Sequence, residues 1–236
     1  MKKKDFSPSV KKLKNVPMDN VDNTLQFESY LKTKQFNQLY DKMLWGEGPC
    51  YIPNKDLLVW SDIPNDRMLQ LHDNKISEFK NPANFCNGNT TDTNDNLISC
   101  SHGGRCLYIY DDDFNRSLLI DKFEGKKFNS PNDICVKSDG TIWFTDPPYG
   151  ILSDYEGYPG DQEYGGCYVF KYDPHTNILE VILKDLDRPN GIAFSSDESK
   201  IYIADTGENI KYLYVYDLDK NDDLINKKLI YDFKPF

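Results

Sequence analysis

The chain contains one sequence pattern four times, and this repeat restricts the possible folds more than any other feature. Each copy opens with a polar residue, which is followed by a turn, a short apolar strand and usually an aspartate. The opening residues are Glu47, Asn87, Asn132 and Asn190, and the second predicted strand begins ten or eleven residues after each of them. A repeated unit of this kind buries its apolar faces only by stacking against its neighbours.

Two further predicted strands follow each copy, from RMLQL and KISEF after the first to YLYVYD and KKLIYDF after the fourth. They are rich in Tyr, Val, Ile and Phe and alternate as half-buried strands do. The copies begin 40, 45 and 58 residues apart. Four strands in about 45 residues is typical of a β-propeller blade. The sequence therefore predicts an all-β chain with about four propeller blades.

The extra length of the third unit lies in residues 147–166, which are rich in glycine, proline and tyrosine. Such a segment is predicted to leave the sheet between its second and third strands. Two interpretations remain open for it: a lid across the central channel, or an ordinary surface loop.

The first 44 residues do not belong to the repeat. The first 24 are polar and without period, which predicts disorder, and residues 25–44 allow either a short helix or an edge strand. We therefore expect a polar, partly disordered extension over residues 1–44 and a propeller domain over residues 45–236.

Net charge and cysteine content restrict the partners and the compartment. The net charge is -10, and an acidic chain repels phosphate backbones, so nucleic acid is excluded as a partner. No apolar run approaches the roughly 18 residues of a membrane span, and no signal-peptide core is present, so we expect a cytoplasmic protein that does not bind membranes. Its six cysteines are then expected to be reduced and mostly buried.

The opening residues of the four copies carry the predicted chemistry. Innermost strands of a propeller line its channel, so one carboxylate, Glu47, and the carboxamides of Asn87, Asn132 and Asn190 are aimed at a common axis. Hard divalent cations prefer such oxygen donors. Asparagines that merely cap turns are the alternative. The three histidines, His72, His102 and His175, lie in turn-rich contexts and are predicted to be surface residues.

Long ordered motifs from about Trp45 to about Tyr216 resemble the gluconolactonase family, also called the regucalcin or senescence-marker-protein family of six-bladed propellers. The motifs are WGEGPCY, LVWSDIPNDRML, NGNTTD, LISCSHGGR, NSPNDICVKSDGTIWFTDPPYGILSDYEGY and RPNGIAFSSDESKIYIADTG. This resemblance implies hydrolysis of small sugar lactones with one divalent cation, for which we expect calcium, with zinc, magnesium or manganese as alternatives.

The resemblance also implies roles for individual residues. Glu47 of GEGP, Asn132 of SPND and Asn190 of PNG correspond to metal ligands, and Asn132 also lies beside the substrate. Residues expected to contact the substrate besides Asn132 are Ser130, Asp133, Glu163 and Arg105.

One departure from the family pattern is the absence of the fifth-blade PDG-type motif, whose aspartate is the last metal ligand and the general base. The chain is therefore expected to be an incomplete propeller with impaired activity, in which Asp133 is a weak substitute base. Its open blade faces predict self-association. Two other functions remain open: a non-catalytic binding platform, and phosphotriesterase-type hydrolysis with the same metal.

Overall fold

The structure is a computed structural model, and it describes residues 39–233 of the chain. Contacts divide the chain into two units, Met1–Leu44 and Trp45–Phe236, and the second unit holds every helix and strand of the described residues. The disorder predicted for the first 24 residues falls outside the described residues, as does most of the predicted helix or edge strand. Residues 39–44 contain no helix or strand.

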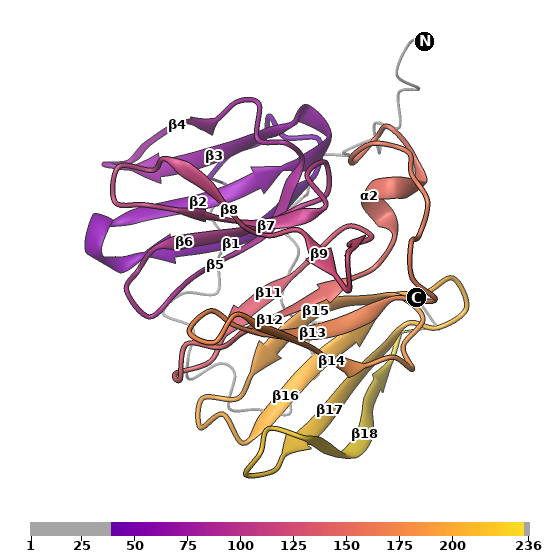
Figure 1. Ribbon diagram of the computed structural model, residues 1–236. Coiled ribbons are helices and arrows are strands. Elements are labelled where there is room, and N and C mark those ends of the chain that lie inside the picture. The colour runs from indigo at the N-terminus through magenta and orange to yellow at the C-terminus, as the bar shows by residue number, and fades with distance from the viewer. Residues whose placement is uncertain (1–38, 234–236) are drawn as a thin grey trace, which may run out of the picture. The chain divides into compact units, whose positions relative to one another are not determined.

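Within the described part of the second unit, the strands form four antiparallel sheets of four strands each, plus one two-stranded hairpin (Figure 1). The strands of each sheet pair in chain order, and the first strand of each sheet, here called the inner strand, contacts the inner strand of the next sheet. This arrangement confirms the predicted all-β propeller architecture with four blades.

The bounds of the strands follow the predicted repeat closely. The first blade contains β1 Gly46–Ile52, β2 Leu57–Asp62, β3 Arg67–His72 and β4 Lys75–Lys80; the second contains β5 Cys86–Thr91, β6 Leu97–Ser101, β7 Cys106–Tyr110 and β8 Arg116–Ile120. The third contains β11 Ile134–Val136, β12 Ile142–Asp146, β13 Tyr168–Asp173 and β14 Ile178–Leu183; the fourth contains β15 Pro189–Phe194, β16 Lys200–Asp205, β17 Tyr212–Leu218 and β18 Leu224–Asp232. The hairpin is β9 Lys122–Phe123 with β10 Lys126–Lys127, and the helical turns are η2 Pro53–Lys55, η3 Ile63–Asn65 and α2 Tyr149–Leu152.

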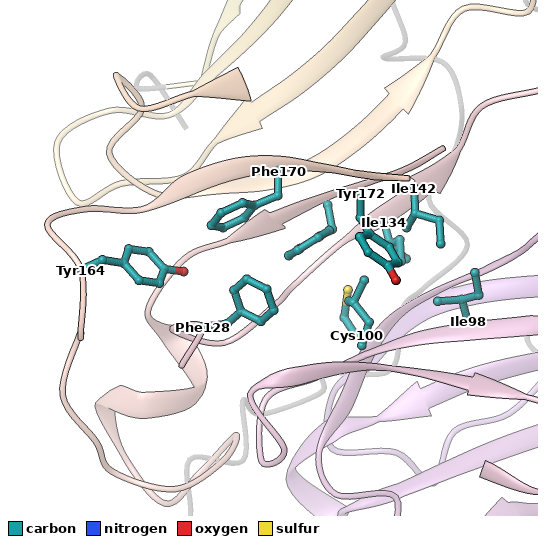
Figure 2. Packing of buried hydrophobic residues seen from close by; sticks show 10 residues of the cluster. Ile98, Cys100, Phe128, Ile134, Ile142, Tyr164, Phe170 and Tyr172 are labelled. Atoms are coloured by element: carbon teal, nitrogen blue, oxygen red, sulfur yellow. The ribbon is translucent and has the colours of Figure 1, made fainter. Parts of the chain in front are cut away.

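The core consists of one apolar cluster between each pair of neighbouring blades. In β12, Phe144 packs into the cluster toward the second blade, whereas Trp143 packs into the cluster toward the fourth. This alternation follows from the two-residue period of a strand. The cluster between the second and third blades is aromatic, and Figure 2 shows Phe128, Tyr164 and Phe170 within it. The Phe144 and Phe170 rings stack with centroids 5.1 Å apart, and Phe128 meets Phe144 edge-on.

A side chain at the end of each second strand fixes the chain that leads into the inner strand. In three blades it is an aspartate that accepts backbone N–H groups: Asp62 from Trp45, Asp146 from Asn129 and Ser130, and Asp205 from Asp187 and Arg188. In the second blade, Ser101 instead donates its hydroxyl to the carbonyl of Asn84. The repeated aspartate is therefore a structural device. It holds the backbone two or three positions before the opening residue and so helps to place that residue.

The inner strands of three blades are irregular at the opening residue. The pairing register shifts between Glu47 and Cys50 in β1, between Cys86 and Asn89 in β5, and between Pro189 and Ile192 in β15. A bulge of this kind takes a residue out of the regular ladder and re-aims its side chain. The bulges therefore give Asn87 and Asn190 orientations that a regular strand would not provide, whereas Glu47 still pairs with Ser61 and the bulge in β1 follows it.

Residues 147–166 leave the third blade between β12 and β13, as predicted, and begin with α2. At one end, Tyr149 donates its hydroxyl to the carbonyl of Thr206, just after β16. Further along, the Tyr158 ring lies edge-on to Phe85, just before β5, with centroids 5.2 Å apart. In each blade the inner and second strands are antiparallel, so the start of the inner strand and the end of the second strand lie at the same edge of the blade. The segment therefore crosses that edge from the fourth blade to the second, and we call it the lid.

Three further features complete the fold. All six cysteines are free, and all except Cys135 are buried, as expected. No helix in residues 39–233 combines the length and the apolar character needed to cross a membrane. Strand β18 exposes several large apolar side chains, namely Ile225, Leu229, Ile230 and Tyr231. Self-association through open blade faces stays a prediction.

Candidate active site

Hydrogen bonds at or next to the opening residues connect neighbouring blades in order. Asn89 donates its amide to the carbonyl of Gly48 over 2.8 Å, which joins the second blade to the first. The backbone N–H of Gly88 donates to the carbonyl of Asn132 over 2.8 Å. The hydroxyl of Thr145 donates to the carbonyl of Asn190 over 2.7 Å, which joins the third blade to the fourth. These bonds join neighbouring blades near the start of their inner strands, although the opening residues lie 40 to 58 residues apart.

His102 lies between two of the predicted carboxamides. Its Nε2 is 3.0 Å from Nδ2 of Asn87 and 3.3 Å from Nδ2 of Asn132, and the ring is 1% exposed. The prediction that all three histidines are surface residues is therefore wrong for His102, while His72 and His175 are exposed. The lid causes this burial, because the carbonyl oxygen of Glu156 lies 3.1 Å from Nδ1 of His102. Burial lowers the pKa of His102 to about 4, so the ring is neutral at pH 7.

Asp133 lies between the inner strands of the second and fourth blades. Its Oδ2 accepts the backbone N–H of Ile192 over 3.1 Å. Its carboxylate faces the positions of Gly88 and Gly191, where no side chain occupies the space. Burial raises the pKa of Asp133, and the negative charge of Glu47 raises it further, although two backbone N–H bonds oppose these effects.

Glu47 is exposed, and its Oε1 accepts the indole N–H of Trp45 over 2.8 Å. Its charge raises the pKa of two other carboxyl groups, Asp133 and the lid residue Glu156, after the larger effect of burial on each. Three carboxyl groups from β1, the third blade and the lid therefore interact electrostatically. Glu156 was not predicted as a site residue. The only sequence signal for it was its place in the lid.

Asn190 is half-buried beside the lid. Its Nδ2 donates to the hydroxyl of Thr206 over 3.2 Å, and Thr206 in turn contacts the hydroxyl of Tyr149 on α2. The nitrogen of this carboxamide is thus bound within the protein, as are the nitrogens of Asn87 and Asn132.

Three of the residues predicted to contact substrate hold the lid in the structure. The Ser130 hydroxyl donates to the carbonyl of Pro147 over 2.6 Å and accepts the N–H of Gly150 over 2.9 Å. Arg105 donates to the carbonyls of Phe128 and Asp161, and its guanidinium lies 3.7 Å from the carboxylate of Glu163. Glu163 also accepts the N–H of Lys127. Their predicted contact with substrate stays a prediction.

The donors at the inner strands fit a hard divalent cation by their chemistry. Such cations bind carboxylate and carbonyl oxygens, and the site offers the Glu47 carboxylate with carboxamides whose nitrogens are engaged elsewhere. In residues 39–233, no three or more His, Cys, Asp or Glu side chains gather into a metal centre. The predicted ligand set differs from such a centre, because two of its three members are asparagine carboxamides.

The fold is a propeller whose inner strands open with one exposed carboxylate and three carboxamides, and the lid crosses the same edge of the blades from the fourth to the second. Residues 45–236 match the family described as SMP-30/Gluconolactonase/LRE-like region, and the chain belongs to this family. The gluconolactonase of Zymomonas mobilis is 31% identical over 205 residues, which cover 80% of this chain and 57% of that protein.

The chain is also similar to solved structures of gluconolactonases and related propellers. A gluconolactonase from Xanthomonas campestris is 35% identical with a TM-score of 0.77, covering 81% of this chain and 64% of that one. Regucalcin from Agrobacterium tumefaciens, a calcium-binding protein, is 19% identical with a TM-score of 0.63 and shares the fold. The chain thus spans a little over half the length of the Zymomonas enzyme and just under two thirds of the Xanthomonas one.

Proposed function

We propose that the inner strands of this chain form a site that hydrolyses small sugar lactones with the help of one divalent cation. The observation that carries the proposal is the carboxylate of Glu47 together with the carboxamides of Asn132 and Asn190. These residues open the inner strands of blades that hydrogen bonds join in chain order. The similarity to two gluconolactonases, at 31% and 35% identity, supports a lactone as substrate.

Glu47, Asn132 and Asn190 are the proposed ligands of the cation. Calcium suits a set of oxygen donors, and magnesium, manganese or zinc are alternatives to be compared. When bound, the cation would polarise the lactone carbonyl and stabilise the charge that develops on its oxygen.

Two carboxyl groups are proposed to act on the attacking water. Burial, and to a smaller extent the charge of Glu47, raises the pKa of both Asp133 and Glu156, so each takes up a proton more readily than an ordinary exposed carboxyl group does. Asp133 is held by the N–H of Ile192, whereas Glu156 is carried by the lid. Asp133→Asn and Glu156→Gln, measured side by side, assign the base as the variant with the larger loss of kcat at similar KM.

Substrate contacts are proposed for Asn132 and Asp133, which lie at the inner end of the third blade. Ser130, Arg105 and Glu163 are proposed to contribute by holding the lid that excludes water, because their polar groups already bind lid backbone or one another.

The test is hydrolysis of glucono-1,5-lactone, followed by acid release above the spontaneous rate. We expect turnover that stops with a chelator, returns with added calcium or manganese and falls in Glu47→Gln. Glu180→Gln, on the exposed outer strand β14, is the matched control and should keep full activity. Turnover of an aryl phosphotriester in place of the lactone would favour phosphotriesterase-type hydrolysis. Absence of any cation-dependent turnover would favour the non-catalytic binding platform.

A further inference from the structure

The contacts of His102 determine which ring nitrogen carries the proton. Nδ1 lies 3.1 Å from the backbone carbonyl oxygen of Glu156. A carbonyl oxygen can only accept a hydrogen bond, so Nδ1 must donate. A neutral ring with its proton on Nδ1 presents a lone pair at Nε2.

That lone pair faces two carboxamides from neighbouring blades. Nδ2 of Asn87 and Nδ2 of Asn132 lie 3.0 and 3.3 Å from Nε2, and all three residues are almost completely buried. A carboxamide can present either its NH2 group or its oxygen to a partner, and an acceptor selects the NH2 group. The ring therefore turns the oxygens of both asparagines away from itself.

We propose that His102 is a positioning residue that joins the lid to the oxygen donors of the site. Through Nε2 it orients the oxygens of Asn87 and Asn132 as ligands, which adds Asn87 to the proposed donor set. Through Nδ1 it holds the lid at Glu156. The ligand half of this inference rests on the proposed function, whereas the lid half does not.

Packing on the other side of the ring supports a fixed orientation. A Cβ atom on Gly150 would lie 2.4 Å from Cβ of His102 and 2.5 Å from its Cγ. The lid backbone therefore lies directly against the base of the side chain. His102 has no room to move away from the two carboxamides while the lid is in place.

Two substitutions separate the two bonds of the ring. In His102→Asn, the amide nitrogen can replace Nδ1 as donor to Glu156, but nothing replaces the acceptor at Nε2. In His102→Gln, the amide oxygen can replace the acceptor at Nε2, but the donor to Glu156 is lost. The readouts are calcium affinity by calorimetry and hydrogen exchange of lid peptides covering residues 150–158.

We expect opposite outcomes for the two variants. His102→Asn should lose about 10- to 100-fold in calcium affinity, as is usual when a residue that orients ligands is removed, and keep its lid protection. His102→Gln should stay within about three-fold of the original affinity and lose lid protection. A merely structural role would impair both variants alike. In the unaltered chain, a long-range 1H–15N spectrum of labelled histidine should show the His102 proton on Nδ1.

Three results would overturn the proposal: a proton on Nε2, equal losses in the two variants, or full calcium affinity in His102→Asn. The spectrum of the unaltered chain decides the case if a variant does not fold. If the unaltered chain binds no calcium, manganese or magnesium, the proposed function and the ligand role of His102 fail. Two measurements then still decide whether His102 holds the lid: the tautomer of His102 in the unaltered chain, and the hydrogen exchange of lid peptides in His102→Gln.

Discussion

Gly88 and Gly191 provide a matched pair of perturbations around Asp133. Each follows an opening asparagine in an inner strand, and each faces the Asp133 carboxylate. A Cβ atom at Gly88 would lie 2.6 Å from the carbonyl oxygen of Asn132, 2.6 Å from Oδ1 of Asp133 and 2.7 Å from its Cα. A Cβ atom at Gly191 would meet nothing closer than 3.8 Å, which is ordinary contact. The two substitutions to alanine should therefore differ sharply.

Gly88→Ala pushes against backbone atoms that cannot rotate away. Overpacking of this kind costs about 1 to 3 kcal/mol, and loss of the Gly88 N–H bond to Asn132 adds about 1 kcal/mol. We expect a loss of about 2 to 4 kcal/mol, or roughly 5 to 15 °C in Tm for a domain of this size. Gly191→Ala should change the free energy of unfolding by less than about 1 kcal/mol in either direction.

Calorimetric melting and urea titration measure both variants, and calcium titration reports whether displacement of Asn132 weakens the site. Gly88→Ala should show weaker calcium binding even below its melting temperature, whereas Gly191→Ala should bind as the unaltered chain does. Equal stability of the two variants would refute the proposed packing of Asp133 between the inner strands.

Three further predictions concern charge and packing. Glu47→Gln removes the one charge among the proposed ligands and should weaken calcium binding at least about ten-fold by calorimetry. The raised pKa of Asp133 means that the folded chain holds this proton to a higher pH than the unfolded chain. This group therefore contributes stability at low pH that is lost as the pH rises through its raised pKa, and calcium should restore the loss in melting experiments. Trp143→Ala removes a fully buried ring between the third and fourth blades and should cost about 3 to 5 kcal/mol in urea titration.

A different outcome would contradict each of these three predictions. Unchanged calcium affinity in Glu47→Gln would remove this carboxylate from the ligand set. A melting temperature of the cation-free chain that falls with rising pH as steeply in Asp133→Asn as in the unaltered chain would contradict the assigned environment of Asp133. A loss below about 1 kcal/mol in Trp143→Ala would mean that the two blades do not share this core.

The blades could be predicted because their signals are local. Alternating residues such as Ile142, Trp143 and Phe144 give the strand and its two buried faces within a few positions, and turn residues mark its ends. The repeat then gives the stacking, because each unit needs neighbours to bury both faces. The repeated aspartate was visible in the sequence, but its hydrogen bonds to the preceding loop were not.

The surroundings of the site could not be predicted, because they depend on contacts distant in sequence. His102 lies in a turn and is buried by contacts distant in sequence, among them Glu156, which lies 54 residues later. Ser130 resembles a substrate contact by motif, yet its hydroxyl binds Pro147 and Gly150 of the lid. The glycine after Asn87 was a usable signal, since it makes room for a side chain from the next blade.

Crystals soaked with manganese and measured for anomalous scattering test the central claim most directly. Manganese is bound by the same oxygen donors and reveals its position independently of the refined coordinates. We predict one strong peak bonded to a carboxylate oxygen of Glu47 and to the amide oxygens of Asn132 and Asn190. A saturating soak with no peak at these three residues, or with a peak at Glu47 that neither asparagine contacts, would contradict the claim.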